Sequence, residues 1–126
     1  MSDSAKVVSV DAIPLKIPFT HGGPSVSWAG SDWQALEIVL VRLQTDSGLV
    51  GWGEAFSYNC RRAVGAMIED SAANARAGKG VSARTPPMPE LQEGMPLWGL
   101  CGITMFPTRA LHIATWDVSA NPLTHS

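Results

Sequence analysis

The order of apolar and polar residues predicts three strands in the first half of the chain. Apolar and polar side chains alternate from residue 7 to 13, which is the pattern of a half-buried strand. Pro14 and Pro18 cannot donate ladder hydrogen bonds, so this strand lies at a sheet edge there or leaves the sheet. Residues 35–44 are apolar on both strand faces, which predicts burial on both sides. Residues 49–54 return as an antiparallel partner.

Glycines mark the turn and the last of these strands. Thr45 to Gly48 reads as a turn with glycine where a left-handed residue is needed. Gly51 and Gly53 weaken the strand that follows, so they indicate a bulge or a close approach of backbone or ligand.

Two helices are predicted after the strands. Asn59 is suited to cap a helix that begins at Cys60 and ends near Gly78. A second helix is expected over residues 108–119. One face of each helix is apolar or small at helical spacing: Val64, Met67, Ile68 and Ser71 in the first, and Leu111, Ala114, Thr115 and Val118 in the second. The predicted fold class is α+β, a three-stranded antiparallel meander followed by helices, with no TIM barrel.

Regular patterns are lost between residues 71 and 107. This segment holds five prolines, among them Pro107, and five glycines, which break helices and strands. The chain is therefore divided into residues 1–70, an irregular segment 71–107, and residues 108–126. Two explanations stay open for the middle segment: a frameshifted stretch of coding sequence, or a genuine variable linker.

Composition and charge narrow the function classes. The net charge is −2 and no basic stripe is present, so nucleic-acid binding is not expected. The N-terminus has no apolar signal region, and the run from Ile38 to Val41 is too short to span a membrane. Cys60 and Cys101 have neither metal nor redox spacing. We expect a cytoplasmic protein with two free thiols.

The strongest motif resembles a known enzyme family. The sequence TDSGLVGWGEA, residues 45–55, follows the long strand, and IPLKIPF at residues 13–19 precedes it. Together they resemble the N-terminal capping domain of the mandelate racemase/muconate lactonizing branch of the enolase superfamily. ALHIATWDV, residues 110–118, resembles the helix that leads from this cap toward the barrel, although His112, Thr115 and Asn121 depart from the family pattern.

The resemblance implies a fragment of a Mg²⁺-dependent enzyme. Family members are racemases, acid-sugar dehydratases or cycloisomerases, in which a (β/α)₈ barrel abstracts a proton alpha to a carboxylate. The chain is expected to end before that barrel. It then has no catalytic residue, metal ligand or cofactor of its own, is inactive alone, and meets a carboxylate substrate only together with a barrel. Two alternatives are a non-catalytic interaction module and a translated remnant without function.

The cap's contribution is expected to be substrate specificity, through two loops at residues 19–33 and 54–60. His21, Trp28, Phe56 and Tyr58 are the predicted specificity residues. Each has an alternative: His21 is merely solvated, Trp28 and Trp33 anchor their loop, and Phe56 and Tyr58 pack under the first helix. Glu54 is expected to hold the loop through backbone amides, with contact to substrate as the alternative. Trp52 is expected to lie in the core or against the barrel. An isolated cap would expose its barrel-facing surface, which favours self-association.

Overall fold

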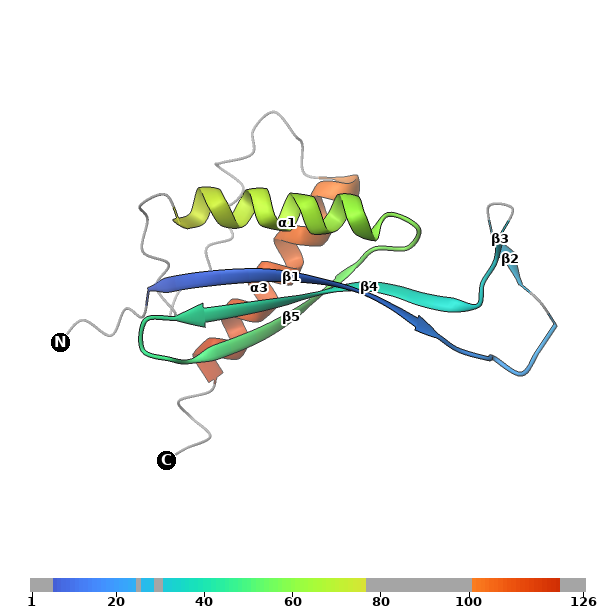
Figure 1. The fold of residues 1–126 in the computed structure, drawn as a ribbon, viewed down its shortest axis with the longest axis horizontal. Helices are drawn as coiled ribbons and strands as arrows, with labels where there is room; N and C mark the ends of the chain where they lie inside the picture. Colours follow the sequence, from blue (N-terminus) through green and yellow to red (C-terminus); the bar gives the residue numbers. More distant parts are fainter. Residues whose placement is uncertain (1–5, 25, 29–30, 77–100, 121–126) are drawn as a thin grey trace.

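The structure, a computed structural model, describes residues 6–24, 26–28, 31–76 and 101–120 (Figure 1). A three-stranded antiparallel sheet has the order β1-β4-β5. Its strands are β1 (Val7–Pro18), β4 (Ala35–Thr45) and β5 (Val50–Phe56). A short hairpin of β2 (Ser27–Trp28) and β3 (Ser31–Asp32) lies between β1 and β4. Helix α1 (Arg61–Arg76), the 3₁₀ turn η1 (Gly102–Thr104) and helix α3 (Met105–Ala120) complete the described fold. The predicted α+β fold, a meander followed by helices, is confirmed.

Strand β1 continues through both of its prolines. Pro14 lies opposite Val39 and Pro18 lies opposite Ala35 in an unbroken register. Because β1 is an edge strand, half of its N–H groups face away from β4, and proline is compatible with that row. The prediction of an edge strand is therefore confirmed, and the alternative that the chain leaves the sheet at these prolines is wrong.

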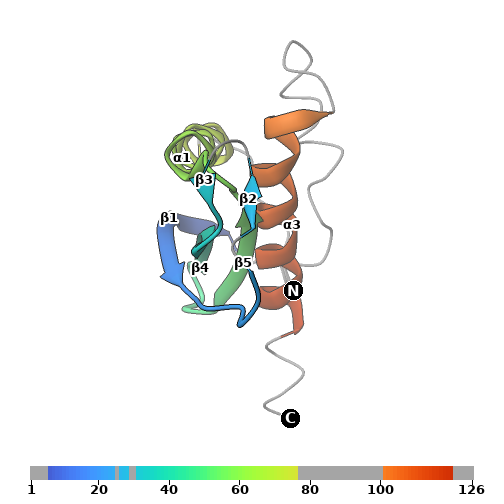
Figure 2. The ribbon, with the colours of Figure 1, turned by 90° about the vertical axis from the view of Figure 1, so that its right-hand side faces the viewer.

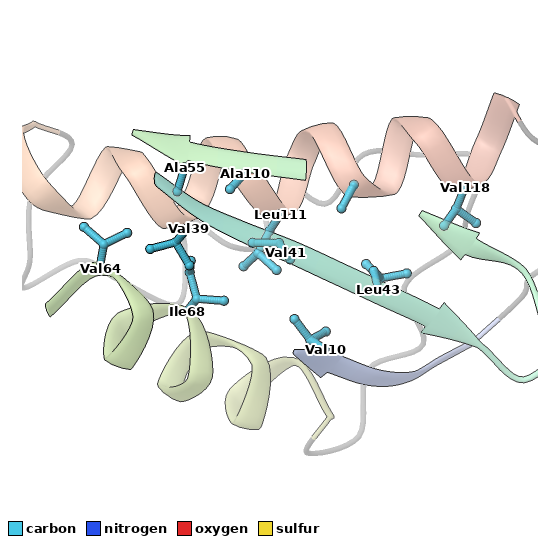
Figure 3. Close-up of a cluster of buried hydrophobic side chains, with 11 residues drawn as sticks. Val10, Val39, Val41, Leu43, Ala55, Val64, Ile68, Ala110, Leu111 and Val118 are labelled. Atoms are coloured by element: carbon cyan, nitrogen blue, oxygen red, sulfur yellow. The ribbon is translucent and has the colours of Figure 1, made fainter. Parts of the chain in front are cut away.

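Both helices pack on the same face of the sheet, which we call the inner face (Figure 2). The core between them is small and aliphatic (Figure 3). It consists of Val10, Val39, Val41, Leu43, Ala55, Val64, Ile68, Ala110, Leu111, Ala114 and Val118. The predicted buried faces of both helices are confirmed, because Val64 and Ile68 of α1 and Leu111 and Val118 of α3 all lie in this cluster.

The opposite face of the sheet, the outer face, is covered by no helix among the described residues. Leu36 of β4 is 37% exposed on this face and Leu40 is half-buried, although Ile38 is buried between its strand neighbours. The prediction that β4 is buried on both sides is thus wrong for the outer face. Apolar residues on both faces of a strand show what it can bury, whereas the placement of the helices decides which face is covered.

Gly51 and Gly53 allow α3 to approach the sheet closely. A Cβ atom added at Gly51 would collide with the carbonyl oxygen of Ala114, and one at Gly53 with that of Ala110. The β4–β5 register contains no bulge here, so the close approach predicted from the glycines is that of a helix backbone. The predicted turn is also present: Gly48 has a φ of 85°, and its N–H donates to the carbonyl of Thr45 at 3.0 Å.

The helix ends differ from the sequence-based bounds. Asn59 has a φ of 55° and lies in the turn before α1, so the predicted Asn59 cap is wrong. The carbonyl of Cys60 accepts the first helical bond, from Val64 N–H at 3.0 Å. Helix α1 continues past residue 70 to Arg76, and α3 begins before residue 108. Pro107 falls in the first turn of α3, where its missing N–H costs nothing. The predicted stop at Gly78 and the questions about residues 77–100 lie outside the described residues.

Candidate functional site

The two loops predicted to carry specificity leave the sheet at the same end. Strand β1 ends at Pro18 opposite Ala35, and β5 ends at Phe56 opposite Ile38, only three residues further along β4. The β2–β3 hairpin extends from this end, and the segment from β5 to α1 turns back from it (Figure 1). Phe19 N–H donates to the carbonyl of Gln34 at 3.0 Å, which holds the base of the hairpin segment together.

Aromatic rings form a continuous series across this end, which we call the aromatic row. In order of contact it consists of His21, Phe19, Trp33, Tyr58, Phe56 and Phe106. Successive ring centroids lie 6.3, 5.3, 6.3, 6.4 and 5.6 Å apart. Such distances are typical of edge-to-face and offset-stacked pairs. The row therefore connects both loops with the start of α3.

Three of the four predicted specificity residues belong to the aromatic row. His21 is exposed, and its Nδ1 accepts the N–H of Gly23 at 3.3 Å. Tyr58 is half-buried between Trp33 and Phe56.

Phe56 is 55% exposed on the outer face, so the alternative that it packs under α1 is wrong. The backbone of Trp28 pairs with Ser31 in the β2–β3 hairpin. Its side chain lies outside the described part of the chain.

Phe19 and Phe106 belong to the row but were not predicted. Phe19 directly follows Pro18 at the strand end, and that adjacency could have drawn attention to it. Phe106 is distant in sequence and reaches Phe56 only because α3 packs beside β5. Trp33, considered above as a loop anchor, makes an edge-to-face contact with Phe19 and another with Tyr58. It thus holds the hairpin segment against the second loop.

Trp52 and Glu54 lie on the outer face of β5, on either side of Gly53. Trp52 is 44% exposed, so its placement in the core is wrong. Its backbone N–H, on the free edge of the sheet, donates to Oδ2 of Asp117 at 2.8 Å and ties β5 to α3. Glu54 is exposed and has no hydrogen bond or ion pair to the described residues. Among the described residues, Glu54 therefore does not hold the loop through backbone amides.

Burial raises the pKa of the Cys60 thiol, and the negative charge of Glu37 raises it further. Lys16 pairs with Glu37 at 3.8 Å. Over the described ranges, no three His, Cys, Asp or Glu side chains gather in a way that could hold a metal ion. No helix in the described part of the chain is long and apolar enough to cross a membrane.

Comparison with known proteins identifies the family of this domain. The family model of the mandelate racemase / muconate lactonizing enzyme N-terminal domain matches residues 8–126, including the irregular segment. Among curated proteins, none matches the chain.

Similar solved structures include an enolase from Bradyrhizobium in complex with magnesium and mandelic acid, with 20% identity and a TM-score of 0.79. An enolase-superfamily member from Agrobacterium tumefaciens has 24% identity and a TM-score of 0.77. The alignments cover 98% and 94% of this chain but only 34% and 35% of those chains, so the chain spans about a third of their length. At these identities the likeness shows the fold alone.

Proposed function

Because this chain belongs to the mandelate racemase / muconate lactonizing enzyme family through that family's N-terminal domain, we propose that it is a substrate-specificity cap. The cap would serve a Mg²⁺-dependent enzyme of the enolase superfamily that abstracts a proton alpha to a carboxylate. Racemisation, acid-sugar dehydration and cycloisomerisation are the reactions in question. The observation that carries the proposal is the aromatic row, because it joins the two loops at one end of the sheet.

The row is suited to selecting substrates by shape and polarity. Its rings offer apolar surface, and His21 and Tyr58 add one imidazole and one hydroxyl that can form hydrogen bonds. A cap that closes over a barrel excludes water and thereby strengthens electrostatic interactions at the reacting carbon. In this role the row contacts the part of the substrate away from the carboxylate, and Trp28 is proposed to contribute from the hairpin.

Several similar structures hold magnesium, among them the Bradyrhizobium enolase, but the described residues of this chain offer no site for it. Their acidic and histidine side chains do not gather in threes, so they do not fit a magnesium ion. We therefore assign no step of the reaction to a metal held by these residues. The proton abstraction itself belongs to groups outside them.

A chimeric enzyme tests the proposal. The cap of the Bradyrhizobium enolase is replaced by this chain, and kcat/KM is measured over a panel of aryl, alkyl and sugar carboxylates. We expect activity with a substrate preference that changes when Tyr58 is replaced by alanine. Arg62→Ala, an exposed change on α1 outside the row, is the matched control. A preference that is the same with and without the Tyr58 ring would contradict the proposed role.

The isolated chain provides a second measurement. With Mg²⁺ present, it should not exchange the alpha proton of mandelate with deuterium from D₂O, as followed by proton NMR. Exchange above the buffer rate would show that the chain carries a catalytic base, contrary to the proposal.

A further inference from the structure

The outer face of the sheet carries apolar side chains from all three strands. The strand registers place eight apolar side chains on it: Ile13, Leu15, Ile17, Leu36, Ile38, Leu40, Trp52 and Phe56. Four of these, one or two from each strand, are between 37% and 55% exposed. None of the described helices lies on this face, because α1 and α3 both pack on the inner one (Figure 2). Apolar patches of this kind typically mark interaction sites.

Three charged side chains lie on this face: Asp11 of β1 is opposite Arg42 of β4, and Glu54 of β5 is diagonal to Arg42. Arg42 of β4 is opposite Trp52, and Glu54 of β5 is opposite Leu40. Arg42 forms an ion pair with Oδ2 of Asp11 at 3.3 Å and donates a hydrogen bond to Oε1 of Gln44 at 3.4 Å. Glu54 has no partner among the described residues. Within the described residues, the face thus presents a carboxylate without a partner, and a guanidinium that has further N–H donors beyond its two contacts.

This arrangement is self-complementary. Two copies can face each other across a two-fold axis that lies between their sheets and runs perpendicular to the line from Arg42 to Glu54. This axis places Arg42 of each copy opposite Glu54 of the other copy, as an isologous interface requires. Trp52 and Leu40 occupy the other diagonal, so they lie near the axis and pack against their own counterparts.

We propose that the outer face binds the outer face of a second copy of this chain, with Arg42 and Glu54 paired across the interface. The proposal does not depend on the capping function. It accounts for the position of Glu54 between two exposed aromatic residues, with no partner in the described part of the chain, since the second copy supplies its guanidinium.

The size of the face sets the strength of the association. Three strands about 4.8 Å apart and about seven residues long give a flat area of roughly 14 by 23 Å, on the order of 300 Å². Stable interfaces bury about 800 Å² per partner, so even with side-chain relief this face is smaller than a stable interface, and the association is weak. The dimer is therefore in reversible equilibrium with the monomer.

Sedimentation equilibrium of the 126-residue chain between 10 μM and 1 mM tests the proposal. We expect a concentration-dependent dimer that Glu54→Arg weakens at least tenfold, because two guanidinium groups then face each other. Arg42→Glu weakens it similarly. The double variant, with both charges exchanged, restores the dissociation constant to within about threefold of the original, since the pair is re-formed with opposite polarity.

Two controls accompany these variants. Lys16→Glu changes an exposed charge on the inner side of β1 and should leave dimerisation unchanged. Circular dichroism checks the fold of each variant, and Glu54→Arg, which breaks no contact among the described residues, remains informative if Arg42→Glu fails to fold. A chain that is monomeric at 1 mM, or a dimer equally stable in Glu54→Arg, would overturn the proposal.

Discussion

Replacing Gly53 with alanine should destabilise the fold sharply. The new methyl group points at α3 and collides with the carbonyl oxygen of Ala110. Helix α3 must then move away from β5 and loosen the core around Ala55 and Ala114. Overpacking of this kind costs about 1 to 3 kcal/mol, and a backbone obstacle that cannot change rotamer favours the upper end. Against a typical total stability of about 5–15 kcal/mol, this is a large fraction.

Thermal and urea unfolding followed by circular dichroism measure the effect. A loss of about 3 kcal/mol lowers Tm by roughly 10 °C or more in a domain of this size. Gly65→Ala is the matched control, because a Cβ there would meet only Cγ of Pro14, at an ordinary 3.6 Å. Inside helix α1 that change should stabilise the fold by about 0.5–1 kcal/mol. The same chemical substitution thus has opposite signs at the two positions.

A second variant identifies the cause. Because the obstacle at Gly53 is a carbonyl oxygen rather than a methyl group, adding Ala110→Gly should not restore stability. If Gly53→Ala unfolds within 0.5 kcal/mol of the original chain, or if Ala110→Gly rescues it, the explanation from close backbone packing is incorrect.

Three further predictions concern single side chains. Ser71→Ala should leave the free energy of unfolding in urea unchanged or raise it by about 1 kcal/mol, because the buried Oγ has no hydrogen-bond partner among the described residues. A clear loss of stability would reveal such a partner. Asp117→Ala should reduce the hydrogen-exchange protection of the Trp52 amide while Asp117→Asn keeps most of it, and equal protection in all three chains would refute the tie between α3 and β5. Burial and the charge of Glu37 raise the pKa of the Cys60 thiol in the folded chain, so in the unfolded chain this thiol ionises at a lower pH. The free energy of unfolding therefore falls as pH rises above the ordinary cysteine pKa. Iodoacetamide should accordingly modify Cys60 faster in Glu37→Gln, and an unchanged rate would count against the charge effect.

Local patterns in the sequence predicted the strands of the three-stranded sheet, the turn between β4 and β5, and the buried faces of the helices. The alternation in β1 and the Gly48 turn fix a meander, since strand side chains repeat every two residues and only glycine adopts a φ of 85° without strain. The helical spacing of Leu111 and Val118 identified the buried face of α3. These features depend on neighbours within a few residues, which a single sequence contains. The start of α1 was not predicted correctly, because Asn59 has a left-handed backbone and Cys60 is the residue that precedes the helix.

Tertiary packing decided the site and the surfaces. The sequence contained Phe56 and Phe106, but only the placement of α3 beside β5 brings their rings within 5.6 Å. From the sequence, Gly53 could have faced either a ligand or another backbone segment. The structure shows that it faces the backbone of α3. Which face of β4 is covered also follows from where both helices pack, not from the strand itself. Contacts between residues far apart in the chain depend on how whole elements fill space against one another, and no local pattern encodes that.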